Sequence, residues 1–233
     1  MVIKMSMMIK YLKIIVCIGV LLFISSVGRS EGIDTKLRTG IKVESDLAKR
    51  LEGILEFQYR LSHNFAQFDR ILVEPSLQYK PWKHIRFGVG YRFIVKDDPK
   101  HQREFGHRVN LSARYKGTLA KRYSVAVKSG LQYGYWQLNN SFLGNKNKLI
   151  NRNSLEVEHQ LFGFPLSPFV GGEIFSHLNY DKGAVFSQYR LALGTHYNMT
   201  KKIRLSMSYM YENELVKPDL DSQILTIVFK YSL

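Results

Sequence analysis

The segment Leu51–Leu61, LEGILEFQYRL, alternates between two kinds of side chain. One side carries Leu51, Gly53, Leu55, Phe57, Tyr59 and Leu61. The other carries Glu52, Glu56, Gln58 and Arg60, with Ile54 as its one apolar residue. Successive side chains of a β-strand point to opposite faces. The segment is therefore predicted to be a strand with one apolar face and one charged face.

The same alternation recurs along the chain to Leu233. We expect strands at residues 36–46, 51–62, 69–80, 85–94, 104–116, 122–135, 150–161, 168–176, 185–197, 203–212 and 223–233. Strands of soluble proteins average about 5–6 residues, whereas a tilted membrane-spanning strand needs about 9–11. The lengths favour one all-β domain, residues 31–233, that forms a closed antiparallel transmembrane β-barrel.

The connections between these segments alternate in length. Short turns are expected at 48–50, 81–83, 117–121, 162–166 and 198–202, and longer polar loops at 95–103, 137–149, 177–184 and 213–221. Short periplasmic turns and longer outer loops are typical of bacterial outer-membrane barrels, which have even strand numbers. The pattern gives eleven segments. We therefore expect about 10–12 strands and favour twelve, with one strand unrecognised near the N-terminus.

Residues 1–30 are predicted to be a signal peptide. Lys4, Lys10 and Lys13 precede an apolar run, Ile14–Ile24, and small residues follow it. That run is shorter than the ~20 residues of a membrane-spanning helix; an uncleaved N-terminal anchor is the alternative. The one cysteine, Cys17, lies in this leader. The net charge is +15 for the whole chain and +11 without Lys4, Lys10, Lys13 and Arg29 of the leader. This remaining charge is spread singly along the strands, which favours lumen and loop charges over nucleic-acid binding.

Alternation alone leaves open which face is inside, because a soluble lipocalin-like barrel would hide its apolar face. Three features favour an apolar exterior. One face keeps almost no charge along the chain, as in Phe87, Val89, Tyr91 and Phe93. The other face is rich in Arg, Glu and Gly. The last segment presents Leu225, Ile227, Phe229, Tyr231 and Leu233 on one face. We expect the outer-membrane assembly machinery to recognise this C-terminal strand, and the outer-membrane bilayer to surround the barrel.

In this register the charged residues of both signs line the lumen. The candidate lumen residues are Glu52, Glu56, Arg60, Arg70, Arg86, Arg92, Arg108, Arg114, Arg152, Glu156, Glu173, Arg190 and Arg204. Arginine forks pair bidentately with carboxylates, and small barrels fill their interiors with side chains. We expect an interlocked ion-pair core that fills the lumen. The alternative is a narrow pore that prefers anions.

The strands carry short motifs of spaced Arg and Glu residues: Glu56–Arg60, Gly90–Arg92, His107-Arg108, Asn151-Arg152 with Leu155-Glu156, Pro168 with Glu173–Phe175, Tyr189-Arg190 with Gly194, and Leu205–Tyr211. Together they resemble the domain-of-unknown-function 2490 family of outer-membrane barrels. The resemblance covers residues 36–233. The family's early Trp strand is absent, and Val125–Gly130 replaces an Arg-x-Arg strand. The resemblance implies the fold and an outer-membrane location, and it implies no activity.

We expect no enzymatic activity, no cofactor and no metal. Lipid-modifying barrel enzymes place His and Ser two residues apart, and no His-x-Ser occurs here. A His–Ser pair on two neighbouring strands stays open, because only the geometry of the fold can show it. Acidic residues at Asp97-Asp98 and Asp219–Asp221 suit solvated loops better than calcium sites. The expected function is a structural barrel or a narrow passive pore. A binding barrel that uses its outer loops is the alternative, and a lipid-modifying barrel enzyme is third.

Overall fold

The computed structural model describes residues 33–97, 103–137, 147–180, 183–215 and 221–233. The predicted signal peptide, residues 1–30, lies outside the described residues. No helix among the described residues is long and apolar enough to cross a membrane.

Eleven strands make up the described fold, and they coincide with the eleven predicted segments. They are β1 (Asp34–Ala48), β2 (Leu51–Ser62), β3 (Gln67–Trp82), β4 (Ile85–Asp97), β5 (Arg103–Ala120), β6 (Tyr123–Gln137), β7 (Lys148–His159), β8 (Leu166–Tyr180), β9 (Gly183–Asn198), β10 (Ile203–Glu214) and β11 (Ser222–Ser232). Most run a few residues beyond their predicted ends, because hairpin pairing continues into the flanking polar residues. The prediction of a long loop at 177–184 is wrong, since β8 and β9 continue through most of it.

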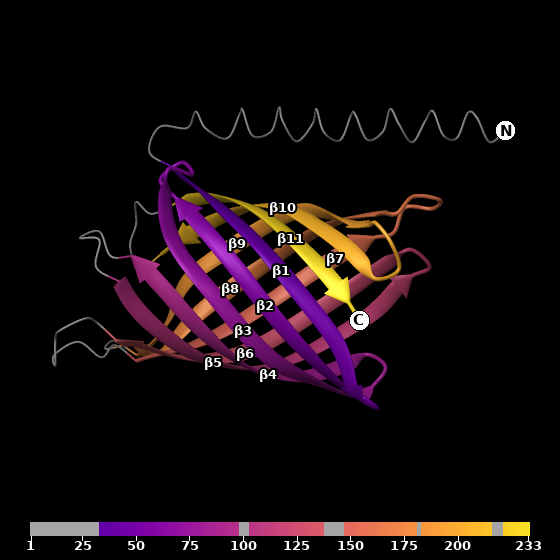
Figure 1. The fold of residues 1–233 in the computed structure, drawn as a ribbon, viewed down its shortest axis with the longest axis horizontal. Helices are drawn as coiled ribbons and strands as arrows, with labels where there is room; N and C mark the ends of the chain where they lie inside the picture. Colours follow the sequence, from indigo (N-terminus) through magenta and orange to yellow (C-terminus); the bar gives the residue numbers. More distant parts are fainter. Residues whose placement is uncertain (1–32, 98–102, 138–146, 181–182, 216–220) are drawn as a thin grey trace.

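The strands form one closed barrel in which each strand pairs with its neighbours in sequence (Figure 1). Sequential pairs are antiparallel, and the barrel closes through a parallel pairing of β1 with β11, from Asp34↔Ser222 to Glu44↔Ser232. An odd number of alternating strands can close only in this way. The favoured count of twelve strands is therefore wrong: β1 bonds directly to β11, which leaves no place for another strand between them.

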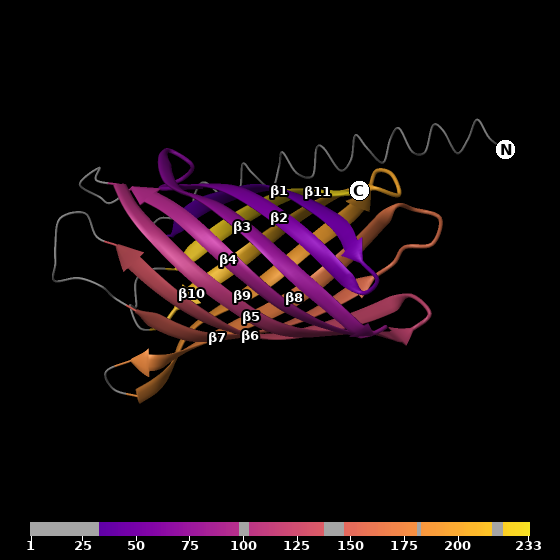
Figure 2. The same cartoon turned by 60° about the horizontal axis from the view of Figure 1, so that its bottom comes forward.

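The two mouths of the barrel differ, as Figures 1 and 2 show. One mouth carries the turns β1–β2, β3–β4, β5–β6, β7–β8 and β9–β10, together with the C-terminus. The other mouth carries the start of β1 and the remaining connections. One of these is the turn at 63–66, where His63, Asn64 and Phe65 have φ of 51°, 57° and 68°. The Asn64 side chain accepts a hydrogen bond from the Thr35 amide (3.3 Å), which ties this turn to the beginning of β1.

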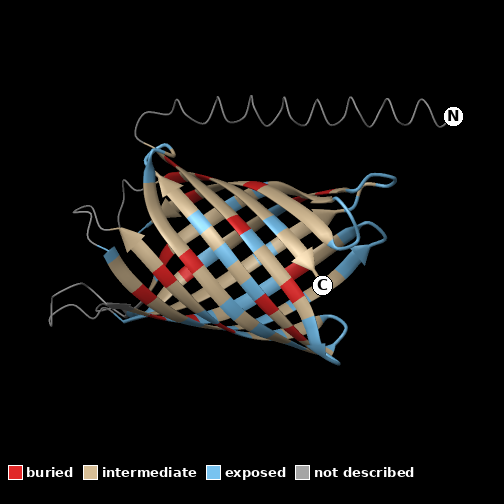
Figure 3. Ribbon diagram, in the orientation of Figure 1, coloured by how far each residue is buried: buried red, intermediate tan, exposed pale blue. Residues whose placement is uncertain are grey.

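Apolar side chains cover the outside of the barrel, and charged side chains lie inside. Figure 3 shows exposed and less exposed positions alternating along the strands. Large exposed side chains on β5 include Val109, Leu111 and Tyr115. Their neighbours on the same strand, Arg108 and Arg114, make contacts inside. The predicted assignment of faces is confirmed, and the fold is not that of a soluble barrel with an apolar interior.

Gly194 on β9 is required by close packing, and its replacement gives a first prediction. A Cβ at this position would lie 2.5 Å from the Met207 carbonyl oxygen of β10 and 2.6 Å from the Phe169 ring of β8. Overpacking typically costs about 1–3 kcal/mol, and we expect Gly194→Ala to reach the upper part of this range because one obstacle is backbone. Gly172→Ala is the matched control, since its nearest neighbouring atom is at 3.7 Å. Urea unfolding of both variants measures the difference, and equal losses would contradict it.

Candidate functional site in the lumen

The lumen wall gathers the charged side chains that the strand alternation predicted. Away from the strand ends and register shifts, even-numbered residues of β1–β7 and β9–β11 and odd-numbered residues of most of β8 face inward. Trp82 and Phe186, next to register shifts, are exposed. This inner face includes Glu52, Glu56, Arg60, Arg70, Arg86, Arg92, Arg108, Arg114, Arg152, Glu156, Glu173, Arg190 and Arg204. The predicted lumen residues thus share one surface, opposite the exposed apolar side chains.

One ion-pair network runs along the wall from β1 through β10, β9 and β8 to β7. Glu212 of β10 pairs with Arg190 of β9 at 2.6 Å and with Arg38 of β1 at 3.4 Å. Arg190 also contacts Glu173 at 3.2 Å, and Glu173 in turn pairs with Arg152. Both guanidinium groups lie over the Phe175 ring, at 4.5 Å for Arg190 and 5.3 Å for Arg152. Charge-assisted hydrogen bonds and cation–π contacts together fix the orientation of these arginines.

The other ion pairs also run along the wall. Arg92 of β4 pairs with Glu74 of β3, and Arg86 of β4 lies 3.6 Å from Glu52 of β2. Lys116 of β5 reaches Glu158 of β7 at 2.8 Å. Each pair therefore joins strands that are adjacent or one strand apart, and among the described residues no ion pair joins opposite walls. Among the described residues, Arg92, Arg108 and Arg114 make no ion pair with Glu52 or Glu56.

Within the described part of the chain, three lumen arginines contact neutral amides and no carboxylate. Arg60 donates to the Gln58 side-chain oxygen at 2.7 Å. Arg108 donates to Gln132 at 3.3 Å, and Arg204 to Asn198 at 2.7 Å. Sequence reasoning missed these amides; the available signal was their place on the same inner face as the arginines. An amide oxygen orients a guanidinium without cancelling its charge, so these positions keep their positive charge.

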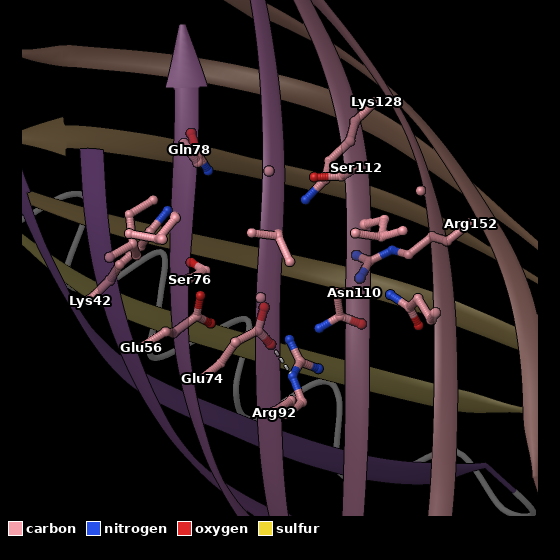
Figure 4. Close-up of a pocket in the computed structure, with 18 of the residues that line it drawn as sticks. Lys42, Glu56, Glu74, Ser76, Gln78, Arg92, Asn110, Ser112, Lys128 and Arg152 are labelled. Carbon is pink, nitrogen blue, oxygen red and sulfur yellow. Dashed lines mark hydrogen bonds and ion pairs between the residues drawn. The ribbon is translucent and has the colours of Figure 1, made fainter. Parts of the chain in front are cut away.

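A cavity of about 110 Å³ lies in the middle of the lumen (Figure 4). Its lining comes from strands β1 to β7. The cations that line it are Lys42, Arg92, Lys128 and Arg152, and the acids are Glu56 and Glu74. Lys128 has no carboxylate partner among the described residues. The space holds several water molecules at about 30 Å³ each, so the interior is polar and partly open in its centre.

A serine–histidine pair also lies in the lumen, near the mouth with the short turns. The His196 Nδ1 and the Ser206 Oγ are 2.8 Å apart on directly opposed positions of β9 and β10. Potential ligand atoms of His196, Glu156 and Glu158 lie within 4.8 Å of one another. Lys116 and Arg114 already pair with these two carboxylates. The cluster therefore forms part of the wall's ion-pair network. The sequence search for His-x-Ser on one strand could not detect a pair that joins two strands.

The loop acids singled out in the sequence lie in part outside the described residues. This applies to Asp98 and Asp219. Asp221 is described, and its carboxylate accepts hydrogen bonds from the Tyr211 hydroxyl at 2.5 Å and the Asn213 amide at 2.6 Å. These contacts fasten the end of β10 to the start of β11, which is a structural role.

The strands form a closed wall of antiparallel pairs with one parallel pair, apolar outside and charged inside. These features define a β-barrel with a polar lumen. The chain belongs to the family described as "Protein of unknown function (DUF2490)", whose model matches residues 38–222. A search of curated proteins gave no match.

Three solved structures are similar to this chain, and the one that reaches a TM-score of 0.50 supports the barrel fold. The β domain of the Bordetella autotransporter BrkA has 12% identity and a TM-score of 0.50, with 78% of this chain and 81% of that chain covered. A bacterial polysaccharide outer membrane secretin has 11% identity, a TM-score of 0.49, and coverage of 76% and 73%. The NanC porin has 13% identity, a TM-score of 0.45, and coverage of 80% and 93%. At these identities the likeness concerns the fold alone.

Proposed function

We propose that the protein is an integral outer-membrane barrel that acts as a narrow passive pore with a preference for small anions. The apolar exterior and charged interior support its insertion in a bilayer, because that distribution is typical of transmembrane barrels. The mouth with the short turns and the C-terminus then faces the periplasm. The bilayer and the assembly machinery that would deliver the barrel to it are the implied partners.

The observation that carries this proposal is the set of lumen cations that have no carboxylate partner among the residues the structure describes. Arg60, Arg108 and Arg204 contact amide oxygens, and Lys128 lines the central cavity. They are spread along the lumen instead of gathering at one point. Rings of Arg and Lys favour anions in pores, and charged clefts raise the local concentration of counter-ions by about tenfold or more.

A structural barrel with a filled lumen is the second candidate. It is favoured by the small size of the interior cavities, about 110 Å³ at the centre and about 100 Å³ near the mouth with the longer connections. In such a barrel the side chains leave room for water and small ions only, and larger solutes are excluded. Conductance decides between the two functions.

The test is single-channel recording of the refolded protein in planar bilayers under a salt gradient. We expect a small conductance and a reversal potential that indicates several-fold preference for chloride over potassium, because the lumen cations concentrate anions. Replacing Arg108 and Lys128 together by Gln should bring the ratio of chloride to potassium permeability close to one. Lys201→Gln, in the exposed β9–β10 turn, is the control with the same kind of charge change and should leave the preference unaltered.

Heat-dependent migration on gels verifies that each variant is folded. Absence of any conductance by the folded wild-type barrel would overturn the pore and leave the structural barrel as the function.

A further inference from the structure

A row of cations crosses four neighbouring strands near the mouth with the longer connections. Arg38 of β1 lies directly opposite Arg60 of β2, and Arg60 lies opposite Arg70 of β3. Lys96 of β4 continues the row opposite Arg70. Like charges directly opposite one another destabilise a sheet. Glu104 pairs with Lys96 at 3.8 Å, so the row is unfavourable where negative groups do not balance Arg38, Arg60 and Arg70.

The structure provides a cavity at this place. A space of about 100 Å³ is lined by Lys36, Arg38, Arg60, Arg70 and Arg190, together with Leu61 and two acids, Asp69 and Glu212. Five basic side chains thus face two carboxylates, so the lining carries an excess of positive charge. The two lining carboxylates are too few to neutralise it, and Glu173, which contacts Arg190 from outside the lining, is shared with Arg152.

Both carboxylates are already occupied. Asp69 accepts two hydrogen bonds from Arg70, at 2.8 Å and 3.0 Å. Glu212 is shared by Arg190, Arg38 and Lys36, at 2.6, 3.4 and 3.5 Å. Arg60 is left with the neutral Gln58 oxygen, to which its Nε and one terminal nitrogen both donate. Its guanidinium therefore keeps its full charge and has donors to spare.

We propose that this cavity is a binding site for a tetrahedral dianion, that is, inorganic phosphate or the phosphate group of a small solute. Arginine forks match phosphate oxygens in geometry and charge, and the volume equals that of several water molecules. The excess positive charge of the lining suits a dianion better than a singly charged carboxylate or chloride. The site deepens the proposed anion preference of the pore, because it would concentrate one anion class at the entrance.

The experiment is titration calorimetry of the refolded full-length barrel in detergent with inorganic phosphate, and with chloride and acetate for comparison. We expect saturable binding of phosphate that is tighter than that of either comparator. Arg60→Gln should weaken phosphate binding about tenfold, which corresponds to ~1.4 kcal/mol. Asp69→Asn should strengthen it, because this change releases Arg70 from its carboxylate and adds one net positive charge.

Arg86→Gln is the matched control: it removes a lumen arginine near the opposite mouth, where Lys80 remains beside Glu52. We expect it to leave phosphate binding unchanged. No saturable phosphate binding by the wild type, or equal weakening by Arg60→Gln and Arg86→Gln, would overturn the site. Heat-shifted migration on gels confirms that the variants are folded.

Binding and conduction are measured separately. A barrel that binds phosphate in detergent but carries no current supports the site and rejects the pore. A barrel that conducts anions but does not bind phosphate rejects the site and leaves the pore standing.

Discussion

Replacing Glu212 by Gln is expected to lower the free energy of unfolding by about 3–5 kcal/mol, the cost of breaking a buried ion pair from one side. The Glu212 side chain is only 9% exposed and lies against Arg190, Arg38 and Lys36. The Gln side chain keeps the volume but removes the charge that holds these cations together. Three positive groups then face one another in a poorly solvated part of the lumen. Urea unfolding in detergent or lipid measures the loss.

Glu56→Gln is the matched control on the same inner face. Glu56 contacts the Gln58 side chain and has no ion pair among the described residues. Its removal should cost less than about 1 kcal/mol, as for screened surface charges. If Glu212→Gln is as mild as Glu56→Gln, the lumen is hydrated throughout and its ion pairs contribute little to stability.

A second large effect is expected on the outer surface. Leu111 is 52% exposed and lies in the middle of β5. If the proposed bilayer surrounds the barrel, Leu111→Arg places a charge near its midplane, which costs about 2–4 kcal/mol in transmembrane barrels. The measurement is equilibrium unfolding in lipid vesicles, compared with the same variant in detergent, where the penalty should be smaller.

Leu119→Arg is the control on the same strand and face. Leu119 is 78% exposed and lies at the end of β5, beside the short β5–β6 turn. The penalty for an arginine falls to about 0–1 kcal/mol near the membrane interface. Equal penalties at both positions would mean that the apolar exterior is not graded by membrane depth, and would argue against a bilayer-spanning barrel.

The strands and their two faces could be predicted from the sequence because both depend on a local pattern. Alternation with a period of two is visible within any ten residues, and Leu51–Leu61 shows it alone. The eleven strands could also be counted from the sequence, but we favoured twelve because bacterial outer-membrane barrels have even strand numbers. Closure of the barrel is a pairing between Asp34–Glu44 and Ser222–Ser232, at opposite ends of the chain. Nothing local in either segment indicates that they pair in parallel.

The lumen residues could be predicted as a set, but their partners could not. Whether Arg92 meets Glu74 or a more distant acid depends on the register of β3 against β4 and on the slant of the side chains. The same holds for His196 and Ser206, which are ten residues apart in sequence and directly opposite in the sheet. Amide partners such as Gln58 carry no charge, so the pattern of charged residues in the sequence does not indicate them.

The parallel seam between β1 and β11 also bears on how such a barrel could arise. Duplication or deletion of a β-hairpin changes the number of strands by two. Chain ends that lay at opposite mouths before this change still lie at opposite mouths after it, and ends that shared a mouth still share it. No series of such steps connects an eleven-stranded barrel to an even-numbered one. A step between the two kinds of barrel requires the gain or loss of an odd number of strands, which moves one end of the chain to the other mouth of the barrel.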